Sequence, residues 1–141
     1  MTVRAALAAT ALLAAAQSWN ALACGVCVED RVAAVYDHAI VVRALERRHE
    51  VAFLAIEETL PARAELRRSI EASIEAAQGV DRGTARVSLE SASLSFAYDP
   101  RRAGFGAVLA SVEKKLAPRN LKLSMLRVIG EGAAGAVKGV K

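Results

Sequence analysis

Residues 85–98 read ARVSLESASLSFAY and show the clearest structural pattern in the chain. Apolar side chains recur at every second position on either side of a break near Ser91. These positions are Ala85, Val87 and Leu89, then Leu94, Phe96 and Tyr98. Such alternation is typical of strands that bury one face. Because the two runs are so close in the chain, they predict a β-hairpin.

One strand and one helix are predicted before this hairpin. Residues 51–57 (VAFLAIE) form a short apolar run bounded by charges, which favours a buried strand. A helix over 61–78 follows, with Thr59 as its cap and Pro61 in its first turn. The apolar face of this helix comprises Leu66, Ile70, Ile74 and Ala77.

A second helix and a last strand are predicted after the hairpin. The helix covers 102–116 and ends before Pro118, and the strand covers 121–129. From residue 51 the order is therefore β-α-β-β-α-β. With right-handed crossovers, this order makes a four-stranded antiparallel sheet with two helices on one face. We predict an α+β protein with this ferredoxin-like arrangement over 49–129.

Residues 24–48 are expected to add an N-terminal helix to this core. Apolar residues recur at spacings of three and four over 28–48, which predicts one long helix. The β-branched run Ile40-Val41-Val42 lowers helix propensity. It supports a rival interpretation, a short helix over 28–36 followed by a strand over 39–45.

The first 23 residues have the features of a secretory signal peptide. Arg4 is their only charge, an apolar run follows, and Ala21 and Ala23 form a small-x-small cleavage pattern. We therefore expect an exported, periplasmic protein that begins at Cys24. Cys24 would also stand where a bacterial lipoprotein carries its lipid, so a lipid anchor is the lesser alternative. Residues 130–141 are expected to form a flexible tail, because four of them are Gly.

Composition and motifs exclude several classes of function. The 141 residues carry a formal net charge of +4, without the basic stripe that nucleic-acid binding requires. No window after the signal peptide reaches the roughly 18 apolar residues of a transmembrane helix. The sequence also has no phosphate-binding loop and no nucleophile–base motif. We expect a protein that is not an enzyme.

Cys24 and Cys27 are the only cysteines, spaced Cys-Gly-Val-Cys at the predicted start of the first helix. The N–H groups at a helix start favour thiolate over thiol, and two thiolates one turn apart can converge on one ion. Soft sulfur ligands select ions such as Cu(I), Zn or Hg over hard cations. The same pair could instead be redox-active or form an inert disulfide, and those interpretations stay open.

Other polar residues are weaker candidates. On a single helix His38 would lie about 21 Å beyond Cys24, too far to share an ion with it. His49 is expected at a helix end. Glu57 and Glu58 could form an acid–base pair, but a solvated strand end next to a helix start explains them better.

The stretch Cys24–Val32 (CGVCVEDRV) resembles the metal loop and first helix of the heavy-metal-associated domain family. Those domains are ferredoxin-like modules that pass soft metals, often Cu(I), between proteins. The resemblance implies metal binding at Cys24 and Cys27 and a metal-exchanging protein as partner. A homodimer is the other possible partner, because two copies would supply four sulfur ligands. The chain departs from the family pattern in one respect. In the family the motif lies between the first strand and the first helix, and here that junction, 57–61 (EETLP), has no cysteine.

We therefore expect an exported small protein that binds a soft heavy-metal ion, Cu(I) first, for sequestration or delivery. Cys24 and Cys27 would be its ligands. The alternatives are a thiol–disulfide redox protein that uses the same pair, and a non-catalytic interaction module, free or lipid-anchored, that binds a partner through an open sheet face or a helix.

Overall fold

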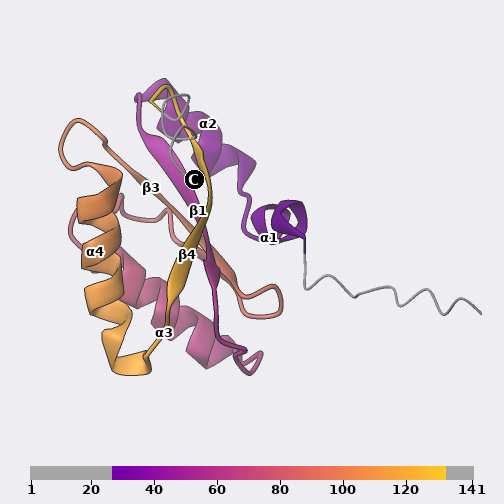
Figure 1. The fold of residues 1–141 in the computed structure, drawn as a ribbon. Coiled ribbons are helices and arrows are strands. Elements are labelled where there is room, and N and C mark those ends of the chain that lie inside the picture. Colours follow the sequence, from indigo (N-terminus) through magenta and orange to yellow (C-terminus); the bar gives the residue numbers. More distant parts are fainter. Residues whose placement is uncertain (1–26, 133–141) are drawn as a thin grey trace, which may run out of the picture.

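The computed structural model describes residues 27–132, which form a four-stranded antiparallel sheet between two layers of helices (Figure 1). The predicted signal peptide, Cys24 and most of the predicted tail lie outside these residues. The elements in chain order are α1 (Val28–Ala34), α2 (His38–Glu46), β1 (Glu50–Ile56), α3 (Ala64–Glu75), β2 (Arg86–Ser88), β3 (Ser93–Tyr98), α4 (Phe105–Leu116), the 3-10 turn η1 (Ala117–Arg119) and β4 (Leu123–Ile129).

The sheet has the strand order β2-β3-β1-β4, with every neighbouring pair antiparallel. From β1 onward the element order is β-α-β-β-α-β, apart from the short turn η1. The predicted ferredoxin-like α+β fold is therefore confirmed. The central position of β1 explains why all seven of its residues are buried.

The main core lies between the sheet and helices α3 and α4. Ala52, Leu54 and Ile56 of β1 point into it, together with Phe96 and Tyr98 of β3. The two helices contribute Ile70, Ile74, Val108, Val112 and Leu116, all completely buried. Alternate residues of the strands thus supply one face, as the sequence pattern predicted.

A second, smaller core covers the opposite face of the sheet. Val51 and Phe53 of β1 pack there with Val32 of α1 and with Ile40 and Val41 of α2. In Figure 1, α1 and α2 lie on the side of the sheet away from α3 and α4. The interaction-module alternative named an open sheet face as one possible binding surface, but on β1 and β3 that face is covered by α1 and α2.

The single helix predicted over 28–48 is also wrong, as is the rival strand over 39–45. The chain leaves the helix after Ala34 and begins a new one at His38. Asp37 causes this restart, because its Oδ1 accepts a hydrogen bond from the N–H of Ile40 at 3.2 Å and so caps α2. Ile40 and Val41 remain helical because the sheet buries both side chains.

Several element ends differ from the prediction. Helix α3 begins after Arg63 rather than at Pro61, and β2 has only three residues because the chain turns from Leu89 to Ala92. Pro118 lies inside η1, which prolongs α4. Among residues 27–132, no helix has the length and apolar character needed to cross a membrane.

Candidate functional site

Cys27 occupies the position directly before α1, with an extended backbone (φ −50°, ψ 153°). The residue is exposed, and its side chain accepts no capping hydrogen bond. Its carbonyl accepts the N–H of Arg31 at 3.0 Å, which closes the first turn of the helix. The thiol of Cys27 is therefore accessible to an ion or to another thiol. Cys24, the other predicted ligand, lies outside the described residues.

The sheet holds α1 in place. A helix of seven residues is not stable alone in water. Ser93 Oγ donates to the carbonyl of Arg31 at 2.9 Å, and Ser95 Oγ donates to the carbonyl of Val35 at 2.9 Å. Both serines belong to β3 and are buried. Two hydrogen bonds from one strand thus fix the helix that carries Cys27.

Charges of both signs lie within one turn of Cys27. Glu29 and Asp30 are in the first turn of α1, where their negative charges oppose a thiolate. Arg127 of β4 neutralises Glu29 through a contact of 2.5 Å between Nη2 and Oε1. Arg31 adds a positive charge on the same helix. Among residues 27–132 these charges nearly cancel, and within that range Asp30 is exposed and forms no ion pair.

The two histidines have different partners and do not contact one another. His38 begins α2, is exposed, and its Nδ1 lies 3.4 Å from the hydroxyl of Tyr36. The chain leaves α1 after Ala34 and begins α2 at His38, so the single helix that placed His38 far from Cys24 does not exist. No group of three or more His, Cys, Asp and Glu residues within 27–132 is arranged to hold a metal ion.

His49 contacts two aspartates. Its Nδ1 lies 2.6 Å from Asp81 Oδ2, and its Nε2 lies 3.6 Å from Asp99 Oδ2. The hydrogen bonds from Arg101, together with its charge, lower the pKa of Asp99. The sequence could not reveal this cluster, because three separate loops supply its members.

The acidic pair at the end of β1 also has a structural role. The N–H of Glu57 donates to the carbonyl of Lys122 at 3.0 Å, and Glu58 Oε2 accepts the N–H of Lys122 at 2.9 Å. The two residues thus hydrogen-bond to Lys122, in the segment that leads into β4.

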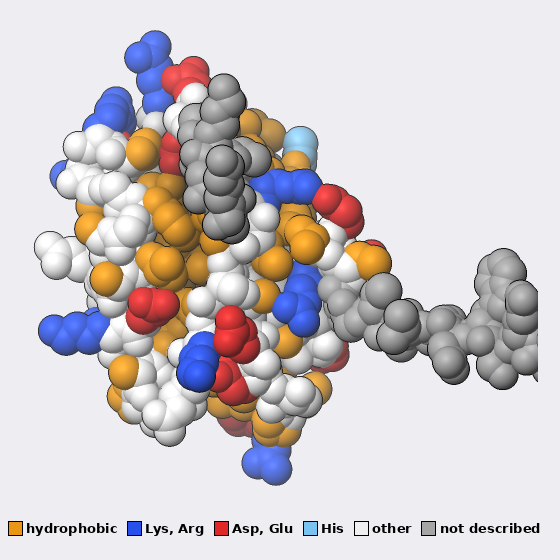
Figure 2. Space-filling model, viewed as in Figure 1, with side chains coloured by type: hydrophobic (Ala, Val, Ile, Leu, Met, Phe, Trp, Pro, Cys, Tyr) orange, Lys and Arg blue, Asp and Glu red, His pale blue; other side chains and the backbone are white. Residues whose placement is uncertain are grey.

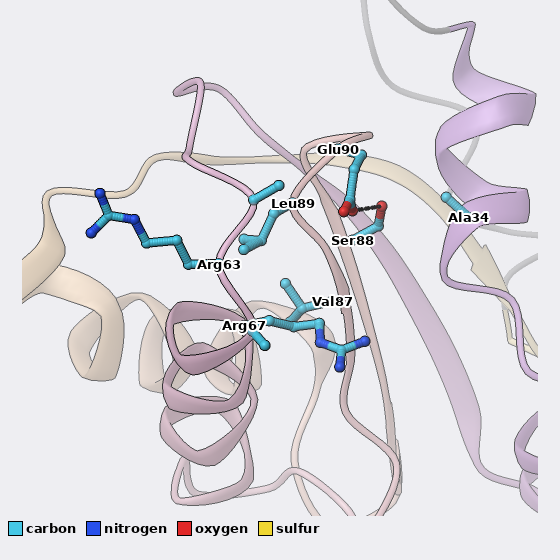
Figure 3. A pocket seen from close by; sticks show the side chains of 9 residues that line it. Ala34, Arg63, Arg67, Val87, Ser88, Leu89 and Glu90 are labelled. Carbon is cyan, nitrogen blue, oxygen red and sulfur yellow. Dashed lines mark hydrogen bonds between the residues drawn. The ribbon is translucent and has the colours of Figure 1, made fainter.

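A polar hollow of about 420 Å³ lies where α3, the β2–β3 hairpin and the end of α1 meet (Figure 3). Arg63, directly before α3, and Arg67 of α3 line it on one side, and Ser88 and Glu90 line it from the hairpin. The Oγ of Ser88 lies 3.5 Å from Glu90 Oε2. The sequence did not predict this hollow, because residues far apart in the chain line it. The spacing of Arg63 and Arg67, one helical turn apart, was its only signal.

The described residues define a ferredoxin-like α+β domain whose second face is covered by two short helices. No family model matches the chain, and no curated protein matches it. Among solved structures it is similar to oxidised MerP from Ralstonia metallidurans CH34, at 13% identity and a TM-score of 0.43, over 55% of this chain and 96% of that one.

Two further solved structures have a similar relationship to the chain. A copper-binding domain from HMA7, a P-type ATPase, is 17% identical over 58% of this chain and 97% of that one, with a TM-score of 0.43. The N-terminal domain of a potential copper-translocating P-type ATPase from Bacillus subtilis, solved in the Cu(I)-loaded state, is 23% identical over 55% of this chain and 86% of that one, with a TM-score of 0.40. At these identities the likeness concerns the fold alone.

Proposed function

We propose that the chain binds a soft heavy-metal ion, Cu(I) first, through the thiolates of Cys24 and Cys27. One observation carries the proposal. Cys27 is exposed at the start of a helix that the sheet holds in place, so its thiol is presented on a fixed support. Cys24 precedes it by three positions, a spacing that lets two sulfur atoms reach one ion.

The donor set favours an ion that two ligands satisfy. Tetrahedral zinc takes four ligands, and the described residues offer no His, Cys, Asp and Glu group that would complete such a site around Cys27. Cu(I) is satisfied by two thiolates. Four thiolates from two copies of the chain would serve an ion of higher coordination number.

The proposal includes export, a periplasmic location and a non-catalytic role in sequestration or delivery. It also gives the metal motif a different place from that of the heavy-metal-associated domains. The junction between β1 and α3 carries Glu57 and Glu58, which bind the chain at Lys122. Cys27 lies directly before α1 instead, and α1 belongs to the layer that covers the other face of the sheet.

Native mass spectrometry of the reduced chain, titrated anaerobically with Cu(I), tests the proposal. We expect one ion per chain, and loss of that ion in Cys27→Ser and in Cys24→Ser. Met125→Leu is the matched control, because Met125 carries the only other sulfur in the described residues and is 51% exposed. This variant should bind like the wild type.

Three results would contradict the proposal. The first is no complex at any Cu(I) concentration. The second is a complex that survives both serine substitutions. The third is a chain that resists reduction and has lost the mass of two hydrogen atoms, which would favour the disulfide interpretation. An added lipid on Cys24 would remove one thiolate and favour the anchored alternative.

A further inference from the structure

The two edges of the sheet are built differently. Edge strand β2 has three residues, and its Arg86 is tied to Asp37. Edge strand β4 has seven residues, and among 27–132 it pairs only with β1. Short, charged edges resist pairing with other chains, whereas long apolar edges promote it. By this criterion β2 is protected and β4 is open.

Apolar side chains follow the open edge on the face that α4 covers. Met125 is 51% exposed, the most exposed of the large hydrophobic residues in the described chain. Leu123 and Val128 of β4, with Phe105 and Leu109 of α4, are only partly buried against the main core. Figure 2 shows hydrophobic side chains gathered between α4 and β4 in the view of Figure 1.

An ion pair marks the other face of the same edge. Arg127 of β4 and Glu29 of α1 lie 2.5 Å apart, with side chains 42% and 70% exposed. The pair therefore offers one positive and one negative group side by side on the surface. A two-fold axis beside β4 would bring each Arg127 toward the second copy's Glu29. The edge is thus complementary to itself in charge, as an isologous interface requires.

We propose that β4 pairs edge to edge, in antiparallel orientation, with β4 of a second copy of the chain. Within 27–132, the side of β4 that faces away from β1 has backbone N–H and C=O groups that a further strand could bond. The exposed Met125 and the Arg127–Glu29 pair are compatible with a second copy related by a two-fold axis. The two sheets would join into one continuous sheet. Because Glu29 follows Cys27 by two positions, the joint would lie beside the first turn of α1 in both copies. This dimer does not depend on metal binding at Cys24 and Cys27.

Sedimentation velocity tests the proposal on the full chain with Cys24→Ser and Cys27→Ser, in a chelator, so that neither a disulfide nor a metal can link two copies. The concentration should span about 1 μM to about 1 mM, which covers weak and moderate affinities. We expect a monomer–dimer equilibrium in that range. Met125→Lys should weaken it by about tenfold or more, because a lysine on an edge strand opposes pairing. Val42→Lys, at a residue 38% exposed on α2, is the control and should change it less than about twofold.

A mixing experiment separates the contact between copies from the ion pair within one chain. Glu29→Arg alone and Arg127→Glu alone each place like charges side by side, so each variant should dimerise less than the wild type. An equal mixture of the two should form heterodimers more tightly than either variant forms homodimers, because opposite charges then meet only between chains. Circular dichroism of each variant shows whether its fold is retained.

Hydrogen exchange of the backbone amides shows which strand forms the dimer interface. Amides in 123–129 should become more protected as the dimer forms, while those in 86–88 should not change. A chain that stays monomeric up to the highest concentration overturns the proposal. So does a dimer that Val42→Lys weakens as much as Met125→Lys, or one that protects β2 instead of β4.

Discussion

Asp37 and Arg86 lie 49 positions apart in the chain and form one charged link between the second helical layer and the sheet. Arg86 donates from Nε at 3.2 Å and from Nη2 at 3.1 Å to Oδ2 of Asp37. The other oxygen of the same carboxylate caps α2. One aspartate therefore starts a helix and ties it to edge strand β2.

Asp37→Ala should lower the stability of the whole domain, because it removes the cap of α2 and leaves Arg86 without its partner. We expect a lower midpoint in urea unfolding, followed by circular dichroism. Asp30→Ala is the matched control, since Asp30 is exposed on α1 and forms no ion pair within 27–132. Equal midpoints for the two variants would contradict the role assigned to Asp37.

Stability should fall in acid because two carboxylates are held ionised in the folded state. The backbone N–H of Ile40 and the charge of Arg86 lower the pKa of Asp37, and the Arg101 guanidinium lowers the pKa of Asp99. The unfolded chain therefore takes up protons at a higher pH, near the usual aspartate value of about 4. The stabilisation is present above that pH and is lost as the pH falls through the lower, folded pKa values.

Urea midpoints measured between neutral pH and strong acid check this dependence. The double variant Asp37→Asn, Asp99→Asn should be less stable at neutral pH, and its urea midpoint should fall less steeply as the pH is lowered. A urea midpoint that falls with pH as steeply as that of the wild type would show that other groups cause the loss of stability in acid.

Gly130 should be intolerant of a side chain. A Cβ there would lie 2.5 Å from Cγ of Glu50, which is buried. Two hydrogen bonds hold the Glu50 side chain in place: its Oε2 accepts the hydroxyl of Tyr98 at 2.5 Å, and its Oε1 accepts the N–H of Gly132 at 3.1 Å. Gly130→Ala should therefore cost about 1–3 kcal/mol of unfolding free energy.

Gly106 on α4 is the matched glycine, because a Cβ there would meet nothing within 4 Å. Gly106→Ala should stabilise the domain by about 0.5–1 kcal/mol, since alanine has the higher helix propensity. Urea unfolding of both variants gives the comparison. A Gly130→Ala chain as stable as the wild type would refute the close packing on Glu50.

Ser95→Ala should destabilise α1 locally without unfolding the sheet. It removes the hydrogen bond to the carbonyl of Val35 and leaves that carbonyl without its donor, a loss of about 1–3 kcal/mol. We expect faster hydrogen exchange for amides in 28–34 and little change in β1. Ser124→Ala on β4 is the control, because residues 27–132 show no side-chain hydrogen bond for Ser124. Uniformly faster exchange in α1 and β1 would contradict a local role.

The fold could be predicted because its strands alternate. Val87, Leu94 and Phe96 fall on one face of the hairpin, and the main core follows from that pattern. The restart at Asp37 was missed because the apolar stripe of α1 continues into α2, so that spacing alone cannot show a break. The cap of α2 is a local contact between Asp37 and Ile40. The link from Arg86 to the same aspartate arises only in the folded chain.

The candidate site was predicted from chemistry rather than from position. Cys27 was identified by its spacing from Cys24, and the structure adds that it is exposed on a helix held by Ser93 and Ser95. Those two serines were unremarkable in the sequence, because their partners are backbone carbonyls 62 and 60 residues away.

X-ray absorption at the copper edge, on the Cu(I)-loaded chain, shows directly which atoms bind the ion. We expect a first shell of two sulfur atoms, without nitrogen or oxygen ligands, in the wild type and in Met125→Leu alike. A first shell that contains histidine nitrogen, or one that is unchanged in Cys27→Ser, would contradict the proposed site.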